Sequence, residues 1–178
     1  MQEYKNVMLI SPDEIKANGD LNYNVTDDII GASIRASQNI YLRDVIGSAL
    51  LEKIQQLVWN KIKELGDDID TEANVPYKTL LDEYISPVLT NKVVSEICVR
   101  ISLRIRNMGV VQNSDININA ATLQDIQYLK DTYDTYYNDA LNRMAEFICQ
   151  NKGAYPESDF ICGCGKNPKY ARTGLYLG

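Results

Sequence analysis

Cysteines are the residues of this chain whose type and spacing most suggest chemistry, because Cys162 and Cys164 lie one residue apart and Cys149 precedes them. A structural zinc site, however, takes four ligands, usually in pairs near C-x₂-C with histidine filling gaps. The chain contains no histidine, and the fourth cysteine, Cys98, falls in the most apolar predicted helix. We therefore expect no metal and no cofactor, and interpret Cys98 and Cys149 as buried small hydrophobic side chains. A zinc module and a redox C-x-C pair are the alternatives.

Other combinations that support catalysis are missing from the sequence. Without histidine the chain lacks the commonest general acid and base, and it contains no P-loop, nucleophile elbow or H-E-x-x-H motif. The acidic residues of 67–72 resemble a calcium-binding loop only loosely, since the D-x-D-x-D-G spacing is absent. We interpret them as a solvated loop, and we expect that the protein is not an enzyme.

Tyrosines and arginines instead indicate a protein interface. On the last predicted helix Tyr133 and Tyr137 fall in the apolar stripe, while Asp131, Asp134 and Asp139 lie mostly on the solvated side. Half-exposed tyrosines and paired arginines are common where subunits meet. The candidate subunit interface comprises Tyr128, Tyr136, Arg100 and Arg104.

The charge balance argues against a protein that wraps nucleic acid. The formal net charge is −6, whereas binding to phosphates needs clustered lysine and arginine. The alternative to an assembly protein is a helical DNA-binding or packaging accessory protein. It would need a basic face built from Arg100, Arg104, Arg106, Lys92 and the C-terminal segment.

The C-terminal segment from Ile161 onward has a composition of its own. It contains basic residues and no acidic one, and its glycines disfavour a helix and permit close approach of the backbone to a partner. A basic, aromatic-tipped segment on an acidic body is typical of an arm that orders when it binds an adjacent subunit or another protein. The candidate partner-binding residues of this arm are Lys166, Lys169, Tyr170, Arg172, Leu175, Tyr176 and Leu177.

Length and composition indicate one globular unit. The chain has 178 residues, of which 45% are apolar and 24% charged, and this is enough for a hydrophobic core. No apolar run approaches the roughly 20 residues that cross a bilayer, and the first residues lack the pattern of a signal peptide. We expect no membrane association, and cysteines that stay thiols in a reducing cytosol.

Helix signals recur along the chain. Ser11-Pro12-Asp13-Glu14 is typical of a capping box, and Thr26 is a second N-cap candidate. Gly47 interrupts the helical pattern, and Gly66 and Gly153 end later segments. We expect helices over 12–18, 27–42, 48–65, 76–86 and 88–107, and from Thr122 or Asn119 to Gly153.

The segment 88–107 has apolar residues on nearly every side, so it should be the central, most buried helix. Its β-branched residues leave a strand as a lesser possibility. For 110–122 we expect a loop or a small hairpin.

These patterns predict an all-α fold, a compact bundle of four to five helices with extended non-helical N- and C-terminal arms. We expect an N-terminal arm with a short helix (1–25), a helical bundle (26–153) and an extended C-terminal arm (154–178).

Three stretches carry a resemblance to a known family: "IRASQNIYLRDVIGSALLEKI" (34–54), "YKTLLDEYISPVLTNKVVSEI" (77–97) and "IRNMGVVQNSD" (105–115). Their order and spacing, above all Gln38, Tyr41 and Gly47, resemble the head-to-tail connector or ring proteins of tailed bacteriophages. The resemblance is to the small helical connectors of Bacteroidetes-infecting, crAss-like phages.

The resemblance implies a non-enzymatic virion protein with no catalytic residues. Such connectors form a ring, typically of twelve copies, that docks under the portal protein at the portal vertex, or neck. There they join head to tail and continue the DNA channel. The implied partners are other copies of the chain, the portal protein and further tail or ring proteins. DNA would pass through without specific binding, and assembly would take place in the host bacterial cytoplasm.

Overall fold

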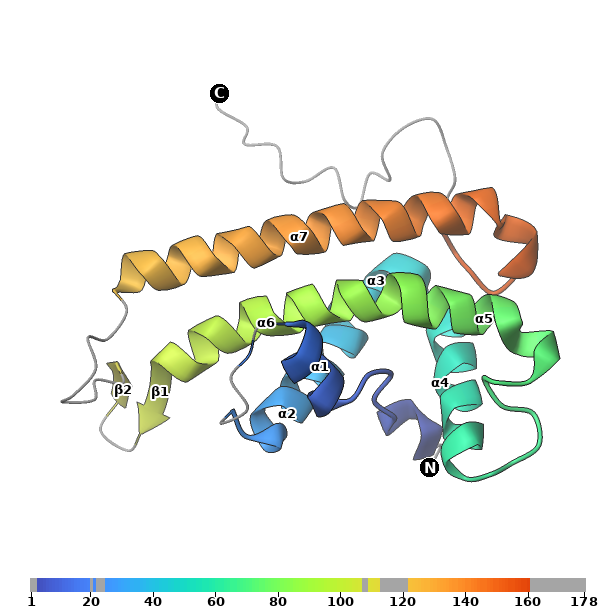
Figure 1. Ribbon diagram of the computed structural model, residues 1–178, viewed down its shortest axis with the longest axis horizontal. Helices are drawn as coiled ribbons and strands as arrows, with labels where there is room; N and C mark the ends of the chain where they lie inside the picture. Colours follow the sequence, from blue (N-terminus) through green and yellow to red (C-terminus); the bar gives the residue numbers. More distant parts are fainter. Residues whose placement is uncertain (1–2, 20, 22–24, 107–108, 113–121, 161–178) are drawn as a thin grey trace.

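The computed structural model describes residues 3–19, 21, 25–106, 109–112 and 122–160, without the side chains of residues 3 and 101–112. Two long helices, α6 and α7, lie side by side along the longest axis (Figure 1). Helices α1 and α2 pack against α6. The α-helices are α1 (Pro12–Asn18), α2 (Asp27–Ser37), α3 (Arg43–Ile46), α4 (Ser48–Ile62), α5 (Val75–Thr79), α6 (Ser86–Ser102) and α7 (Leu123–Gln150). The predicted all-α bundle is confirmed.

Two predicted N-caps, Ser11 and Thr122, form side-chain cap hydrogen bonds, whereas Thr26 stands at the N-cap of α2 without one. The Ser11 side chain accepts a hydrogen bond from the Glu14 backbone N–H at 3.1 Å, which satisfies one of the otherwise unpaired amides of α1. Thr122, rather than Asn119, opens α7 through a capping box with Asp125. Gly47 separates α3 from α4 with φ +85°, and a Cβ there would lie 2.9 Å from Oδ2 of Asp159.

Two π-helical turns, η2 (Gln38–Leu42) and η4 (Leu80–Ile85), interrupt the helical stretches. The prediction that Pro87 ends a helix is wrong, because α5, η4 and α6 follow one another without a break. A proline ring normally collides with the carbonyl four residues earlier and lacks an N–H donor. The wider turn of η4, in which the Ser86 N–H bonds to the Leu81 carbonyl, lies directly before the proline and accommodates it.

The predicted helix over 88–107 ends early. Helix α6 stops at Ser102, and strand β1 (Leu103–Arg106) pairs antiparallel with β2 (Gly109–Gln112), Ile105 lying opposite Val110. The β-branched residues favour this hairpin once α6 has left the bundle core. The small hairpin expected after residue 109 therefore takes its first strand from the end of the expected helix.

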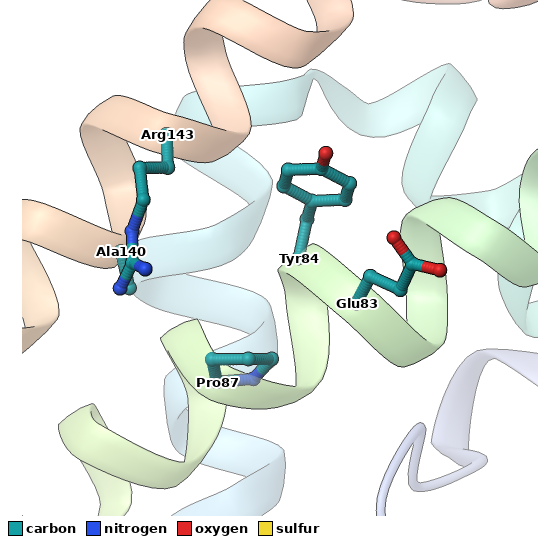
Figure 2. A pocket seen from close by; sticks show the side chains of 5 residues that line it. All are labelled: Glu83, Tyr84, Pro87, Ala140 and Arg143. Carbon is teal, nitrogen blue, oxygen red and sulfur yellow. The ribbon is translucent and has the colours of Figure 1, made fainter.

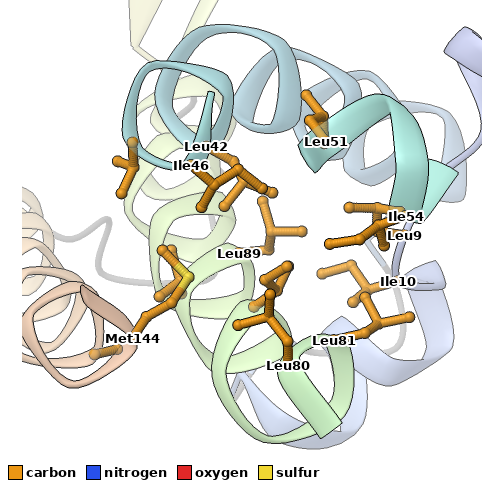
Figure 3. Packing of buried hydrophobic residues seen from close by; sticks show 14 of the residues in the cluster. Leu9, Ile10, Leu42, Ile46, Leu51, Ile54, Leu80, Leu81, Leu89 and Met144 are labelled. Carbon is orange, nitrogen blue, oxygen red and sulfur yellow. The ribbon is translucent and has the colours of Figure 1, made fainter. Parts of the chain in front are cut away.

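Helix α6 is the most enclosed element, as predicted. Val88, Leu89, Val93, Val94 and Ile97 are all at most 1% exposed. Side chains from the N-terminal segment, from η2, α3 and α4, and from α7 meet around it in one core (Figure 3).

The buried side chain of Gln38 binds the N-terminal segment to this core through two hydrogen bonds. Its Oε1 accepts a hydrogen bond from the Leu9 N–H at 2.8 Å, and its Nε2 donates to the Val7 carbonyl at 2.9 Å. Val7, Leu9 and Ile10 are buried beside it. Both polar ends of the amide are satisfied in a site from which water is excluded.

The residues after α7 fold back onto α5. Tyr155 is 1% exposed and donates from its hydroxyl to the Pro76 carbonyl at 2.8 Å. Burial raises the pKa of Tyr155 to about 12. Tyr77 donates to Glu157 at 2.9 Å, and Phe160 is also buried. Residues 155–160 are thus part of the packed body, and those from 161 onward lie outside the described residues.

We predict that Gln38→Ala lowers the free energy of unfolding by about 2–4 kcal/mol, because two buried backbone groups lose their partners. Urea denaturation followed by circular dichroism measures this. The matched control is Gln127→Ala, which removes an exposed amide from α7 and should change stability by less than about 0.5 kcal/mol. Equal effects of the two substitutions would contradict the role assigned to Gln38.

Candidate functional site

The first half of α7 leaves large apolar side chains uncovered. Leu123 is 61% exposed, Tyr128 76%, Leu129 45% and Tyr136 53%. This end of the helix extends toward the β1–β2 hairpin (Figure 1). Tyr128 and Tyr136, two of the predicted interface residues, therefore lie on the surface, where a partner can reach them.

Tyr128 lies on an acidic helix face. Asp125 and Asp131 are three residues before and after it, so both carboxylates flank the ring. Asp131 accepts a hydrogen bond from Gln127 Nε2 at 2.6 Å, and the hydrogen bonds from Thr122 lower the pKa of Asp125. The nearest basic residue of α7, Lys130, is bound to Asp134. We call Tyr128 with Asp125 and Asp131 the acidic knob.

Of the other predicted interface and arm residues, the structure describes only some. Arg100 is exposed near the end of α6. The side chain of Arg104 lies outside the described residues, and so do Lys166, Lys169, Tyr170, Arg172, Leu175, Tyr176 and Leu177. Their roles stay predictions.

A polar junction connects α6, α7 and η2 on one side of the bundle. The Lys92 ammonium lies 3.3 Å from Glu96 and 3.4 Å from Asp134. It also lies 4.3 Å from the ring centre of Tyr41 and 5.4 Å from that of Tyr137, within the range of a cation–π contact.

Asp134 is the centre of this junction. It accepts a hydrogen bond from the Ser95 hydroxyl at 2.7 Å and one from Lys130. Burial works to raise the pKa of Asp134, but the hydrogen bonds from Lys130 and Ser95 and the charge of Lys92 outweigh it, so the pKa is lowered. The expectation that Asp134 lies on the solvated side is therefore wrong, whereas Asp131 and Asp139 are exposed as predicted.

The junction holds helices together. Lys92 is only 8% exposed, and its ammonium is occupied by two carboxylates and two rings, so it cannot join a basic face that binds DNA. The junction was not predicted from the sequence. A signal was present in two oppositely charged pairs at four-residue spacing, Lys92 with Glu96 and Lys130 with Asp134.

A surface hollow of about 270 Å³ lies between α7 and the region where η4 passes into α6. Figure 2 shows Arg143 and Glu83 on opposite sides of it, with the Tyr84 ring between them and Pro87 below. Among the described residues Ala140 also lines it. The sequence offered no local signal for this hollow, because its residues come from two elements far apart in the chain.

The acidic loop is occupied by its own contacts, in line with the predicted solvated loop. Asp70 is held by Lys61 at 2.7 Å and Lys78 at 2.6 Å, and hydrogen bonds from both lysines lower its pKa to about 2. Asp67 accepts a hydrogen bond from Asn74 at 2.6 Å. Among the described residues no group of three or more Cys, Asp or Glu side chains is arranged to hold a metal ion.

Both cysteines in the described part of the chain differ from the prediction, because each is only partly buried. Cys149, near the end of α7, is disulfide-bonded, whereas we expected a thiol. Cys98 is a half-buried thiol whose pKa is raised by burial. Within the described part of the chain no helix is long and apolar enough to cross a membrane.

These features define a helical-bundle protein that exposes an aromatic helix face and keeps its buried charges paired. The chain belongs to the family of unknown function DUF6712, whose model matches residues 42–168. That range contains α7, the hollow and most of the polar junction. No curated protein and no solved structure matches the chain.

We predict that Asp134→Asn lowers the free energy of unfolding by about 1–3 kcal/mol near neutral pH, because the charged hydrogen bonds to Lys130 and Lys92 weaken. Since the folded pKa of Asp134 lies below its ordinary value of 3.8, its stabilisation is present above that pH. It is lost as the pH falls further through the folded pKa.

Urea unfolding at a series of pH values checks this. The difference between the wild type and Asp134→Asn should shrink below pH 3.8, where protonation removes the same charge. The matched control is Asp131→Asn, an exposed carboxylate on the same helix. A difference between the wild type and Asp134→Asn that does not depend on pH would disprove the role of the charge.

Proposed function

We propose that this chain is a structural virion protein of a tailed bacteriophage that forms a homo-oligomeric ring below the portal. In this role it joins head to tail and continues the DNA channel. It acts by self-assembly and docking, and it has no enzymatic activity.

The observation that carries the proposal is the group of uncovered apolar and aromatic side chains on the first half of α7. Four large side chains on that half are each at least 45% exposed, although the rest of the same helix is packed into the bundle. Exposed apolar groups gathered on one element are typical of a surface that another protein covers. Tyrosine suits such a surface, because its ring is apolar and its hydroxyl tolerates water.

The pairing of charged side chains within the subunit supports an assembly role. The Lys92 and Asp134 charges are engaged inside the polar junction, and the carboxylate of Asp70 in the acidic loop is held by two lysines. These paired groups stabilise the subunit itself. Contacts with other subunits are then made by the exposed side chains. The net charge of −6 also suits a channel wall that does not grip DNA during ejection.

The resemblance to head-to-tail connectors supplies the rest of the proposal. It favours a ring of twelve copies at the neck of the virion, bound on one side to the portal protein and on the other to further tail or ring proteins. It places assembly in the host bacterial cytoplasm. The predicted arm from residue 161 onward would then reach the portal or a neighbouring subunit.

We predict that virions of the phage that encodes this chain contain it in multiple copies, as a ring coaxial with the portal. Mass spectrometry of purified particles gives the protein inventory, and electron cryomicroscopy of the neck gives the position. Particles that are complete without this polypeptide would disprove the proposal.

A DNA-binding assay distinguishes the alternative function. Fluorescence anisotropy with labelled duplex DNA should show no binding at physiological ionic strength. Binding that weakens steeply with added salt would instead favour a packaging accessory protein.

A further inference from the structure

We propose that the acidic knob of one copy docks into the hollow of the next, with the Tyr128 ring inserted between Tyr84 and Arg143. This inference rests on the proposed function, because it specifies the contact between neighbouring subunits of the ring. The occupant of the hollow is thus a side chain of a second copy of this protein.

The size of the hollow admits an aromatic side chain. Its volume of about 270 Å³ exceeds that of one aromatic ring with its hydroxyl. Tyr128 is the most exposed large apolar side chain among the described residues, so it is the ring that is available without unfolding any part of the bundle.

The lining of the hollow suits an aromatic guest. Pro87 and Ala140 offer apolar surface. Tyr84 is held in place by its own stacking on Phe147, with ring centres 4.0 Å apart and an angle of 13° between the planes. A rigid aromatic wall costs little side-chain entropy on binding, and the Arg143 guanidinium at the rim can lie over the face of an inserted ring.

One charge of the lining, that of Arg143, is opposite in sign to the charges of the knob, whereas Glu83 has the same sign. Asp125 and Asp131 flank Tyr128, and their helix face carries no lysine or arginine. Arg143 is 65% exposed and contacts Asp139 of its own helix at 3.0 Å. An exposed pair of this kind is weak, so the guanidinium can exchange it for a knob carboxylate that is partly shielded from water in the contact. Glu83 on the opposite rim can accept a hydrogen bond from the inserted hydroxyl.

The distance between knob and hollow makes the contact intermolecular. Tyr128 and Arg143 are fifteen residues apart on α7, or about 22 Å along a straight helix. One copy therefore cannot fill its own hollow. When each knob binds a different neighbour the contact generates a closed ring, as the proposed function requires, or an open filament, whereas two copies that exchange knobs reciprocally form a two-fold dimer.

Two variants test this arrangement. Tyr128→Ala removes the knob and keeps the hollow, while Arg143→Glu spoils the hollow and keeps the knob. Each alone should weaken self-association about tenfold or more, as for the truncation of a central aromatic or arginine anchor. The matched controls are Tyr128→Phe, which keeps the ring, and Lys152→Glu, which reverses an exposed charge just beyond α7. Lys152→Glu should assemble as the wild type does, and Tyr128→Phe, which loses only the hydroxyl contact with Glu83, should weaken self-association less than Tyr128→Ala does.

Mixing the two variants gives the decisive result. The Arg143→Glu copy can still insert its Tyr128 into the intact hollow of the Tyr128→Ala copy, so the mixture should form a one-to-one dimer that grows no further. Multi-angle light scattering and sedimentation velocity measure the masses, and circular dichroism confirms that each variant is folded.

Three outcomes would overturn the contact. The first is a mixture that stays monomeric, and the second is a variant, Tyr128→Ala or Arg143→Glu, that assembles as the wild type does. The third is a wild-type chain that is monomeric at high concentration. None of these results removes the chain from the virion, which the protein inventory of the particles tests separately.

Discussion

A helix with apolar side chains on nearly every side is stable in water only when other elements cover it, and α6 is such a helix. Its buried residues are contacted by α2 on one side and by α7 on another, and α1 also packs against it. The surrounding helices need only one apolar stripe each, because α6 supplies the opposing surface for all of them. The arrangement of the other helices around α6 follows from this requirement.

Polar contacts then decide how the covering elements are oriented. Gln38 binds the backbone at Val7 and Leu9, so the N-terminal segment is held at one defined register. The contacts of Lys92 with Asp134 and Tyr41 likewise hold α7 and η2 at one defined register. A buried charge without partners costs several kcal/mol, so alternative arrangements that separate these groups are strongly disfavoured. Apolar packing stabilises the bundle, and the paired polar groups make it specific.

The extent of α6 also explains why side chains on the first part of α7 are exposed. From Tyr133 onward the helix has α6 beside it, but its first turns reach the end of α6, where the chain changes into the β1–β2 hairpin. Leu123, Tyr128 and Leu129, which come before Tyr133, therefore have no apolar surface of the bundle to cover them and remain exposed, and Tyr136 is exposed beyond Tyr133. Further along α7, Arg143 and Ala140 form a hollow with Tyr84 and Pro87. One helix thus carries both a projecting face and a recess.

Sequence alone determined the features that depend on neighbouring residues. Ser11 and Thr122 cap their helices, and Gly47 breaks one, because capping and backbone strain act over three or four residues. The apolar stripes identified α6 as central and Tyr133 as buried for the same reason. Only the tertiary structure decided how Pro87 fits within a helix, where α6 becomes a strand, that Asp134 is drawn to Lys92, and that Arg143 and Tyr84 line one hollow. These depend on residues that the chain brings together from distant positions, and no local pattern records which distant partner a side chain will meet.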